Sequence, residues 1–191
     1  MKKSMFAIAL ITLSMCCVPL AGSGYAAAVE APVTPEVSAP GDIPDSQAFI
    51  VFKSPAGFSI KVPEGWSRKD DNDGATFNDK YNLISLTYGL SDMPVDMAYA
   101  KSALVPDLEH TERAVKVTKI EEVPLRSGKT VKISYDSNSE PNAVTNKQVR
   151  EENERLYFVK SGKLVVLQLS APKGADNVDQ WKLISTSFKW N

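Results

Sequence analysis

Residues 156–169 constrain the fold more than any other part of the sequence. Two apolar runs flank a Lys-Ser-Gly-Lys turn at 160–163, which is the pattern of a β-hairpin. In the second run Val165, Leu167 and Leu169 fall on one side, because successive side chains of a strand point to opposite faces. The segment therefore predicts two antiparallel strands that bury at least one face.

Further segments share the composition or the alternation of strands. They are residues 49–52, 57–62, 75–77, 82–90, 115–125 and 129–135. The links between them are short, which favours antiparallel pairing. Residues 147–155 are ambiguous, because their composition favours a helix whereas their position between strands favours a polar edge strand.

One helix is expected in the middle of the chain. Its apolar residues at helical spacing are Met93, Met97, Ala100, Leu104 and Leu108. Ser91 or Asp92 can cap this helix, and Pro106 should end or kink it.

A second helix is expected at the C-terminus. It should begin near Asp176 or Asn177, and Gln180 lies at the spacing of a capping box with Asn177. The residues expected to share its buried face are Val178, Trp181, Ile184, Ser185 and Phe188. Strands, a helix, more strands and a final helix predict an α+β fold, with helices packed on a sheet.

The N-terminus has the features of an export signal. Lys2 and Lys3 precede an uncharged apolar run at residues 5–20, and the small residues up to Ala28 fit a signal-peptidase site. The run is shorter than the roughly 20 residues that a transmembrane helix needs. We therefore predict a signal peptide at residues 1–28 and an extracytoplasmic location, periplasmic or secreted, with an uncleaved anchor as the alternative.

Both cysteines, Cys16 and Cys17, lie in this apolar run. A lipoprotein is less favoured, because Met15 fits poorly where a small residue should precede a lipidated Cys16. Cleavage would leave no cysteine, and a chain without cysteine has no disulfide, no thiol catalysis and no thiolate metal site.

The rest of the chain divides into a linker and one domain. Residues 29–47 are rich in proline and poor in large apolar residues, which predicts a semi-extended linker. Residues 48–191 have the length of a single domain. The net charge is −1 and the charges are interleaved, so we expect the domain neither to bind nucleic acid nor to span a membrane.

The two ends of the domain resemble the PsbP-like family. Residues 52–66 are similar to the start of these domains, which open with a Gly-Phe strand and a Pro-x-x-Trp turn. The hairpin at 156–169 and the Ser187-Phe188 pair of the closing helix are similar to the family's C-terminal part. The resemblance extends over roughly 49–191.

The resemblance implies an α/β/α sandwich, in which helices flank a central antiparallel sheet. Members of the family include extrinsic accessory proteins of photosystem II, exported bacterial proteins, and a nuclear protein that binds the GTPase Ran. They share association with partners rather than catalysis. The matching residues are structural, so the resemblance implies no functional site here.

One acidic loop is a candidate binding site. Asp70, Asp71 and Asp73 lie in an Asp-Asp-Asn-Asp-Gly run and could hold a hard cation weakly. An EF-hand aligned on Gly74 would place lysines at two ligand positions, so we predict no dedicated metal site. His110 is the single histidine, and we expect it to be exposed at a helix end.

Adjacent acidic residues are expected to point apart. Glu121 and Glu122, like Glu151 and Glu152, would face opposite sides of a strand and could not converge on one substrate. Trp190 could pack back on the sheet or form part of a partner surface. We predict no catalytic residue and no cofactor site.

Composition and motifs together favour a non-enzymatic binding or accessory module outside the cytoplasm. Its partner would be a protein of the cell envelope, bound through loops such as 70–74 and 136–146. The alternative is a carrier of a small ligand or divalent metal, which requires a pocket with convergent polar groups. A hydrolase is the third class, and it requires a carboxylate or lysine with a shifted pKa in a cleft.

Overall fold

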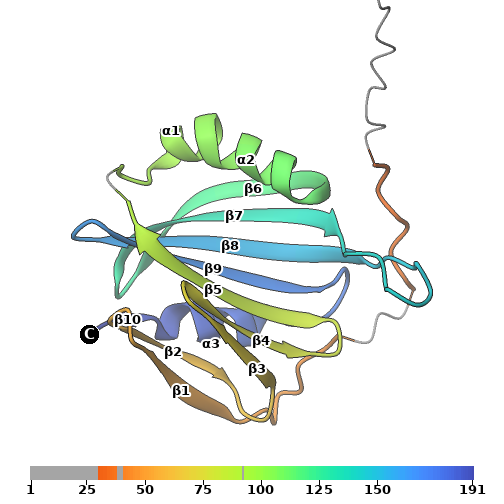
Figure 1. The fold of residues 1–191 in the computed structure, drawn as a ribbon, viewed down its shortest axis with the longest axis horizontal. Coiled ribbons are helices and arrows are strands. Elements are labelled where there is room, and N and C mark those ends of the chain that lie inside the picture. Colours follow the sequence, from red (N-terminus) through yellow and green to blue (C-terminus); the bar gives the residue numbers. More distant parts are fainter. Residues whose placement is uncertain (1–29, 38–40, 92) are drawn as a thin grey trace, which may run out of the picture.

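The computed structural model describes residues 30–37, 41–91 and 93–191 (Figure 1). The elements in these residues are β1 (Phe49–Ser54), β2 (Phe58–Pro63), β3 (Ser67–Asp71), β4 (Gly74–Asp79), β5 (Asn82–Leu90), α1 (Met97–Tyr99), a π-helical segment (Ala100–Leu104), α2 (Val105–Thr111), β6 (Arg113–Leu125), β7 (Gly128–Asn138), β8 (Arg150–Lys160), β9 (Lys163–Pro172), α3 (Val178–Ser187) and β10 (Lys189–Trp190). The predicted signal peptide lies outside the described residues.

The strands form two antiparallel sheets. The large sheet has the order β3-β4-β5-β9-β8-β7-β6, and the small sheet has the order β1-β2-β10. The hairpin predicted at residues 156–169 is confirmed, because Lys160 pairs with Lys163 across a Ser-Gly turn. The antiparallel α+β character is confirmed, whereas the small separate sheet was not predicted.

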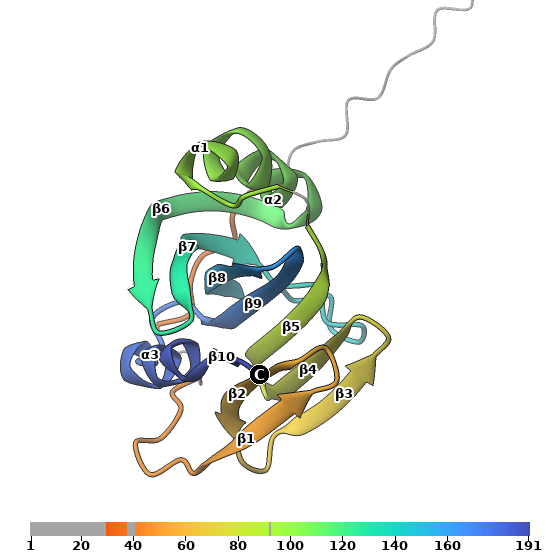
Figure 2. The same cartoon turned by 90° about the vertical axis from the view of Figure 1, so that its left-hand side faces the viewer.

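Each face of the large sheet has its own core. On one face Ala100 and Leu108 of the middle helix pack on β7 and β8, against residues such as Ile133 and Tyr157. On the other face α3 and the small sheet together cover β5, β9 and part of β8 (Figure 2). Trp190 packs into this second core, with its ring 5.2 Å from that of Phe188. Packing of Trp190 back onto the domain, one of the two predicted alternatives, is therefore observed.

The middle helix continues past Pro106 instead of ending there. The N–H of Val105 bonds to the carbonyl of Ala100, five residues back, in the π-helical segment before the proline. The wider turn places Pro106 in the first turn of α2, where a missing N–H costs little. The helix thus accommodates Pro106 through a local change from α-helical to π-helical hydrogen bonding.

The N-cap of this helix is Asp96, not Ser91. The side chain of Asp96 accepts a hydrogen bond from the backbone N–H of Tyr99 at 2.8 Å. The hydroxyl of Ser91 donates to the carbonyl of Met93 instead. Asp92, the other candidate, lies outside the described residues.

Residues 150–155 of the ambiguous segment 147–155 are the first part of β8, which lies inside the large sheet between β7 and β9, whereas residues 147–149 precede the strand. Of the two alternatives, the helix is excluded, and the strand is present but is not an edge strand. Polar residues are tolerated in this interior strand because one of its faces is only partly covered, and because buried ones such as Asn153 are hydrogen-bonded.

The start of α3 also differs from the prediction. Asn177 is the N-cap by position, but its side chain makes no capping bond. Its amide instead donates to the carbonyl of Gly41 at 2.9 Å, and its oxygen accepts the N–H of Ile43 at 2.7 Å. Gln180 bonds to Asp45 rather than closing a capping box. Within the predicted linker, residues 41–47 are therefore held against α3.

One residue of the predicted buried face of α3 is misplaced. Trp181, Ile184, Ser185 and Phe188 are buried, whereas 73% of Val178 is exposed. Val178 stands at the first position of the helix and lines an adjacent groove instead of the core.

Candidate functional site

The acidic run suggested as a weak cation site is mostly a strand. Asp70 and Asp71 belong to β3, where Asp70 pairs with Arg68 at 2.9 Å and Asp71 pairs with Lys69 at 3.4 Å. Asp73 is exposed in the turn before β4. The two strand carboxylates thus already have cationic neighbours, and they lie next to each other along a strand whose side chains alternate.

The structure also shows the positions of other residues that the sequence pattern indicated. His110 is exposed in the last turn of α2, as expected. In the part of the chain that the structure describes, no three His, Cys, Asp or Glu side chains gather closely enough to hold a metal ion. Across the same residues, no helix has the length and apolar character to cross a membrane.

A large groove lies between α3 and the strands β6–β8. Its volume is about 640 Å³, which lies within the range of small-molecule sites. α3 forms one wall, and the end of β6, which bends toward α3, forms the other (Figure 2). Two irregularities in the pairing of β6 with β7 lie nearer the start of β6, between Arg113 and Lys119. The groove exists because α3 and the small sheet leave this part of the large sheet uncovered.

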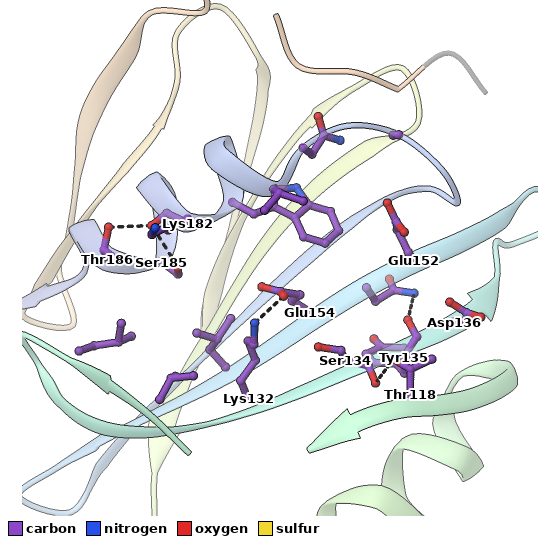
Figure 3. Close-up of a pocket in the computed structure, with 18 of the residues that line it drawn as sticks. Thr118, Lys132, Ser134, Tyr135, Asp136, Glu152, Glu154, Lys182, Ser185 and Thr186 are labelled. Carbon is purple, nitrogen blue, oxygen red and sulfur yellow. Dashed lines mark hydrogen bonds and ion pairs between the residues drawn. The ribbon is translucent and has the colours of Figure 1, made fainter. Parts of the chain in front are cut away.

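The groove combines apolar walls with a charged base. Apolar side chains that line it include Leu125, Leu156 and Trp181. The charged side chains rise from neighbouring strands on the side that faces α3 (Figure 3). They are Lys132 and Asp136 of β7, Glu152 and Glu154 of β8, and Lys173 just after β9.

Ion pairs hold most of these charges. The ammonium of Lys132 lies 2.6 Å from Glu154 and 3.3 Å from Glu121. Burial lowers the pKa of Lys132, but the two carboxylates outweigh it and raise that pKa overall. Lys173 forms an ion pair with the buried Asp136.

Glu152 differs from its neighbours. It is half-buried and directly opposite Asp136 in the β7–β8 register. Burial raises the pKa of Glu152, and the negative charges of Asp136 and Glu154 raise it further. The backbone N–H of Gly174 and the charge of Lys173 act in the opposite direction. The carboxyl is therefore easier to protonate than an ordinary surface glutamate.

These groups suit recognition of a polar ligand with an apolar part. The carboxylates can accept hydrogen bonds and balance positive charge, and the walls can bury a hydrocarbon chain. Hydroxyl groups are present, but those of Ser185 and Thr186 donate to the carbonyl of Lys182 within α3. No histidine lines the groove.

Sequence reasoning did not identify this groove. The prediction that Glu151 and Glu152 lie on opposite faces of the strand agrees with their surroundings. Asp136 and Glu154 raise the pKa of Glu152, whereas Glu112 and Glu140 raise that of Glu151. The carboxylate that comes close to Glu152 is on another strand. A usable signal was the run of polar residues at every second position of β7 and β8, which indicates an uncovered face.

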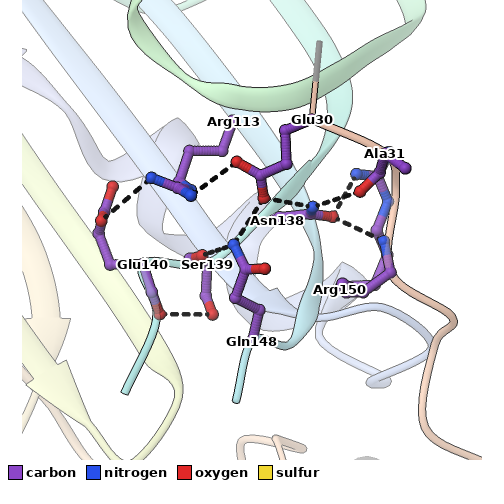
Figure 4. A network of polar contacts seen from close by, with 9 residues as sticks. Glu30, Ala31, Arg113, Asn138, Ser139, Glu140, Gln148 and Arg150 are labelled. Atoms are coloured by element: carbon purple, nitrogen blue, oxygen red, sulfur yellow. Dashed lines mark hydrogen bonds and ion pairs between the residues drawn. The ribbon is translucent and has the colours of Figure 1, made fainter. Parts of the chain in front are cut away.

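A second polar cluster fixes the segment that precedes the domain (Figure 4). The carboxylate of Glu30 accepts bonds from Asn138 at 2.8 Å and Gln148 at 2.6 Å, and it pairs with Arg113 at 2.7 Å. The hydrogen bonds from the two amides lower the pKa of Glu30, and Arg113 adds to this effect. This cluster joins the predicted linker to the ends of β6 and β7.

Solved structures show what the fold is similar to, whereas no protein-family model and no curated protein matches the sequence. The cyanobacterial PsbP protein CyanoP of Synechocystis has a TM-score of 0.54 at 16% identity, and the match covers 81% of this chain and 99% of that chain. The Ran-binding protein Mog1p of Saccharomyces cerevisiae has a TM-score of 0.51 at 10% identity, covering 76% and 96%.

At these identities the likeness concerns the backbone alone. It is compatible with the resemblance of the two ends of the domain to the PsbP-like family. The chain has a PsbP-like α+β fold that consists mostly of antiparallel sheet.

Proposed function

We propose that the protein is a non-enzymatic binding module, and that the groove between α3 and β6–β8 is its binding site. One observation carries the proposal: a hollow of about 640 Å³ in which apolar walls meet five charged groups of the sheet and its margin. Such a combination is typical of ligand sites. It favours the carrier of a small ligand over a protein that docks only through its loops.

Binding accounts for the groove better than catalysis does. Glu152 meets one requirement of a hydrolase, since its pKa is raised inside a cleft. A hydrolase also needs a nucleophile or an activated water beside that group. The hydroxyls of Ser185 and Thr186 are engaged within α3, and that of Thr118 donates to the carbonyl of Ser134. Ser134 also lines the groove, but no histidine is there to activate it, and the raised pKa of Lys132 keeps that neighbour an ammonium rather than a base.

Three further parts of the proposal rest on the sequence and its resemblance. The apolar N-terminal run supports export, so the module acts outside the cytoplasm. An exported module would serve a component of the cell envelope. We also propose the α/β/α sandwich that the resemblance implies, in which α3 shares its layer with the small sheet.

A groove-filling variant tests this function. Thr186 is exposed on α3 and lines the groove, so Thr186→Trp should fill it without touching the core. Asp179→Trp places the same ring elsewhere on α3 and is the matched control. Ligands are sought by thermal unfolding with a metabolite and metal panel, because a ligand at 100 times its Kd adds about 2.7 kcal/mol of stability.

The expected result is a compound that raises the Tm of the wild type and of Asp179→Trp but not that of Thr186→Trp. A compound that stabilises all three proteins equally binds elsewhere and contradicts the groove as the site. Turnover of the compound in any of these mixtures would contradict a purely binding role.

A further inference from the structure

The groove is lined by three lysines and three carboxylates, but they are not all paired with one another. Lys182 is exposed on α3, and the other five charged side chains come from the sheet and its margin. Lys132 contacts Glu154, and Lys173 contacts Asp136. Among the described residues, no lysine or arginine forms an ion pair with Glu152. The negative charge left over is therefore on Glu152.

Glu152 is also the carboxylate that a positive charge would stabilise most. It is half-buried, with Asp136 opposite on β7 and Glu154 two residues along the same face of β8. Partial removal from water strengthens its interaction with any nearby charge. A cation beside it would relieve both the lost hydration and the repulsion from its two neighbours.

We propose that the groove binds a small organic cation, an ammonium or guanidinium group on an apolar chain, with Glu152 as its counter-ion. The inference rests on the proposed function, because it names the ligand class for the same groove. Pro124, Leu125 and Val178 line the groove with apolar surface that is not buried in the core, and they can cover the chain.

Other occupants fit less well. A divalent metal needs several oxygen ligands around one point, and the described residues contain no such group. An anion would face Asp136, Glu152 and Glu154. Lys182 lines the groove but is exposed, and a solvated surface ammonium needs no counter-ion. A volume of about 640 Å³ also fits a whole small molecule.

Matched probes and matched variants test this proposal. The probes are n-butylamine and n-butylguanidine, with pentan-1-ol as the neutral and hexanoate as the anionic counterpart. The protein is expressed as the full chain, so that any processing takes place in the cell, and binding is measured by calorimetry. Glu152→Gln removes the charge at nearly constant shape. Glu109→Gln makes the same change on the exposed side of α2.

The expected result is that both cations bind, and that Glu152→Gln weakens them by about tenfold or more, the scale of a charged hydrogen bond. Glu109→Gln should leave their Kd unchanged. Circular dichroism and Tm establish that both variants fold, which we expect because Gln avoids the burial of a charge.

The remaining outcomes separate the two proposals. If pentan-1-ol or hexanoate binds as well as the amines, and Thr186→Trp removes that binding, the cation proposal is overturned while the groove function stands. Peptides that contain lysine are tested in the same way. If they bind but neither n-butylamine nor n-butylguanidine does, the proposal that the ligand is a small molecule is overturned. If no probe binds to the folded protein, both the cation proposal and the groove function lose their support.

The pH profile distinguishes a counter-ion from a merely structural residue. The charged groups around Glu152 are Lys132 and Asp136 on β7, Glu154 on β8, Lys173 after β9 and Lys182 on α3. The cation binds the ionised carboxylate, so affinity should fall as the pH decreases through the raised pKa of Glu152. Glu152→Gln should flatten the profile, and an unchanged profile in that variant overturns the assignment.

Discussion

The two faces of strands β7 and β8 differ in how their polar groups are satisfied. On the face toward α2, Arg155 bonds to both Glu112 and Gln168 at 2.5 Å, and Asn153 donates to Ser137 at 2.9 Å. On the face toward α3, Glu152 has no ion-pair partner among the described residues. A covered face lacks water and pairs most of its polar groups, although the hydroxyl of Tyr135 and the Nε of Arg155 have no partner there among the residues described. A groove that is open to solvent can leave a charged group for a ligand.

Glu151 is an exception on the face toward α2, because its pKa is also raised. It belongs to the α2 side of β8, and burial raises its pKa to about 7, with further contributions from Glu112 and Glu140. Both faces therefore carry a glutamate that resists ionisation. Both glutamates are partly buried, but Glu152 lines the groove and is therefore placed to meet a ligand there.

The largest effect should come from comparing neighbouring residues on opposite faces of β7. Ile133 is fully buried against the middle helix, so Ile133→Ala should lower the free energy of unfolding by about 3–4 kcal/mol. Ser134 lines the groove, and Ser134→Ala should change it by less than about 0.5 kcal/mol. Urea denaturation measures both. Equal losses would show that the groove face is as tightly packed as the covered face.

A smaller effect should appear in the pH dependence of stability. Because the pKa of Glu151 is raised in the folded state, the folded protein binds this proton more tightly than the unfolded chain does. Its contribution is complete below the unfolded pKa of about 4.5 and is lost as the pH rises through about 7. The loss should be on the order of 3 kcal/mol, because the rise of the pKa from 4.5 to about 7 is worth roughly 1.4 kcal/mol per pH unit.

The variant Glu151→Gln checks this assignment. It should remove that part of the slope of unfolding free energy against pH between 4.5 and 7. Glu109→Gln, on the exposed surface of α2, should leave the slope as it is. A slope that survives in Glu151→Gln would place the responsible group elsewhere.

The smallest effect concerns the segment before the domain. Glu30→Gln should weaken its contacts with Arg113 and the amides of Asn138 and Gln148, and should lower stability by about 1 kcal/mol. Glu36→Gln, on the exposed part of the same segment, is the control and should be neutral. Hydrogen exchange of residues 30–37 would report the loss locally. Identical exchange in both variants would show that Glu30 does not hold the segment.

The sequence predicted well wherever local pattern and chain neighbours agree. The hairpin of β8 and β9 followed from alternation and a Ser-Gly turn, and both strands lie where that pattern put them. It predicted less well where a contact with a residue far away in the sequence determines the local structure. Asn177 is of a residue type that often caps helices, but its side chain bonds to the carbonyl of Gly41 and the N–H of Ile43 instead. Rules for helix capping consider only residues close to the helix start in the sequence, so they cannot predict contacts with distant residues.

By itself, the sequence determined the α+β class, the antiparallel pairing of the later strands and the apolar faces that form the cores, because these depend on residue periodicity and short turns. Only the tertiary structure decided that β8 is an interior strand and that α3 stops short of covering β7. Glu152 comes opposite Asp136 through strand register, which is fixed by the packing of whole faces and not by either residue. The groove and its unpaired carboxylate follow from that arrangement.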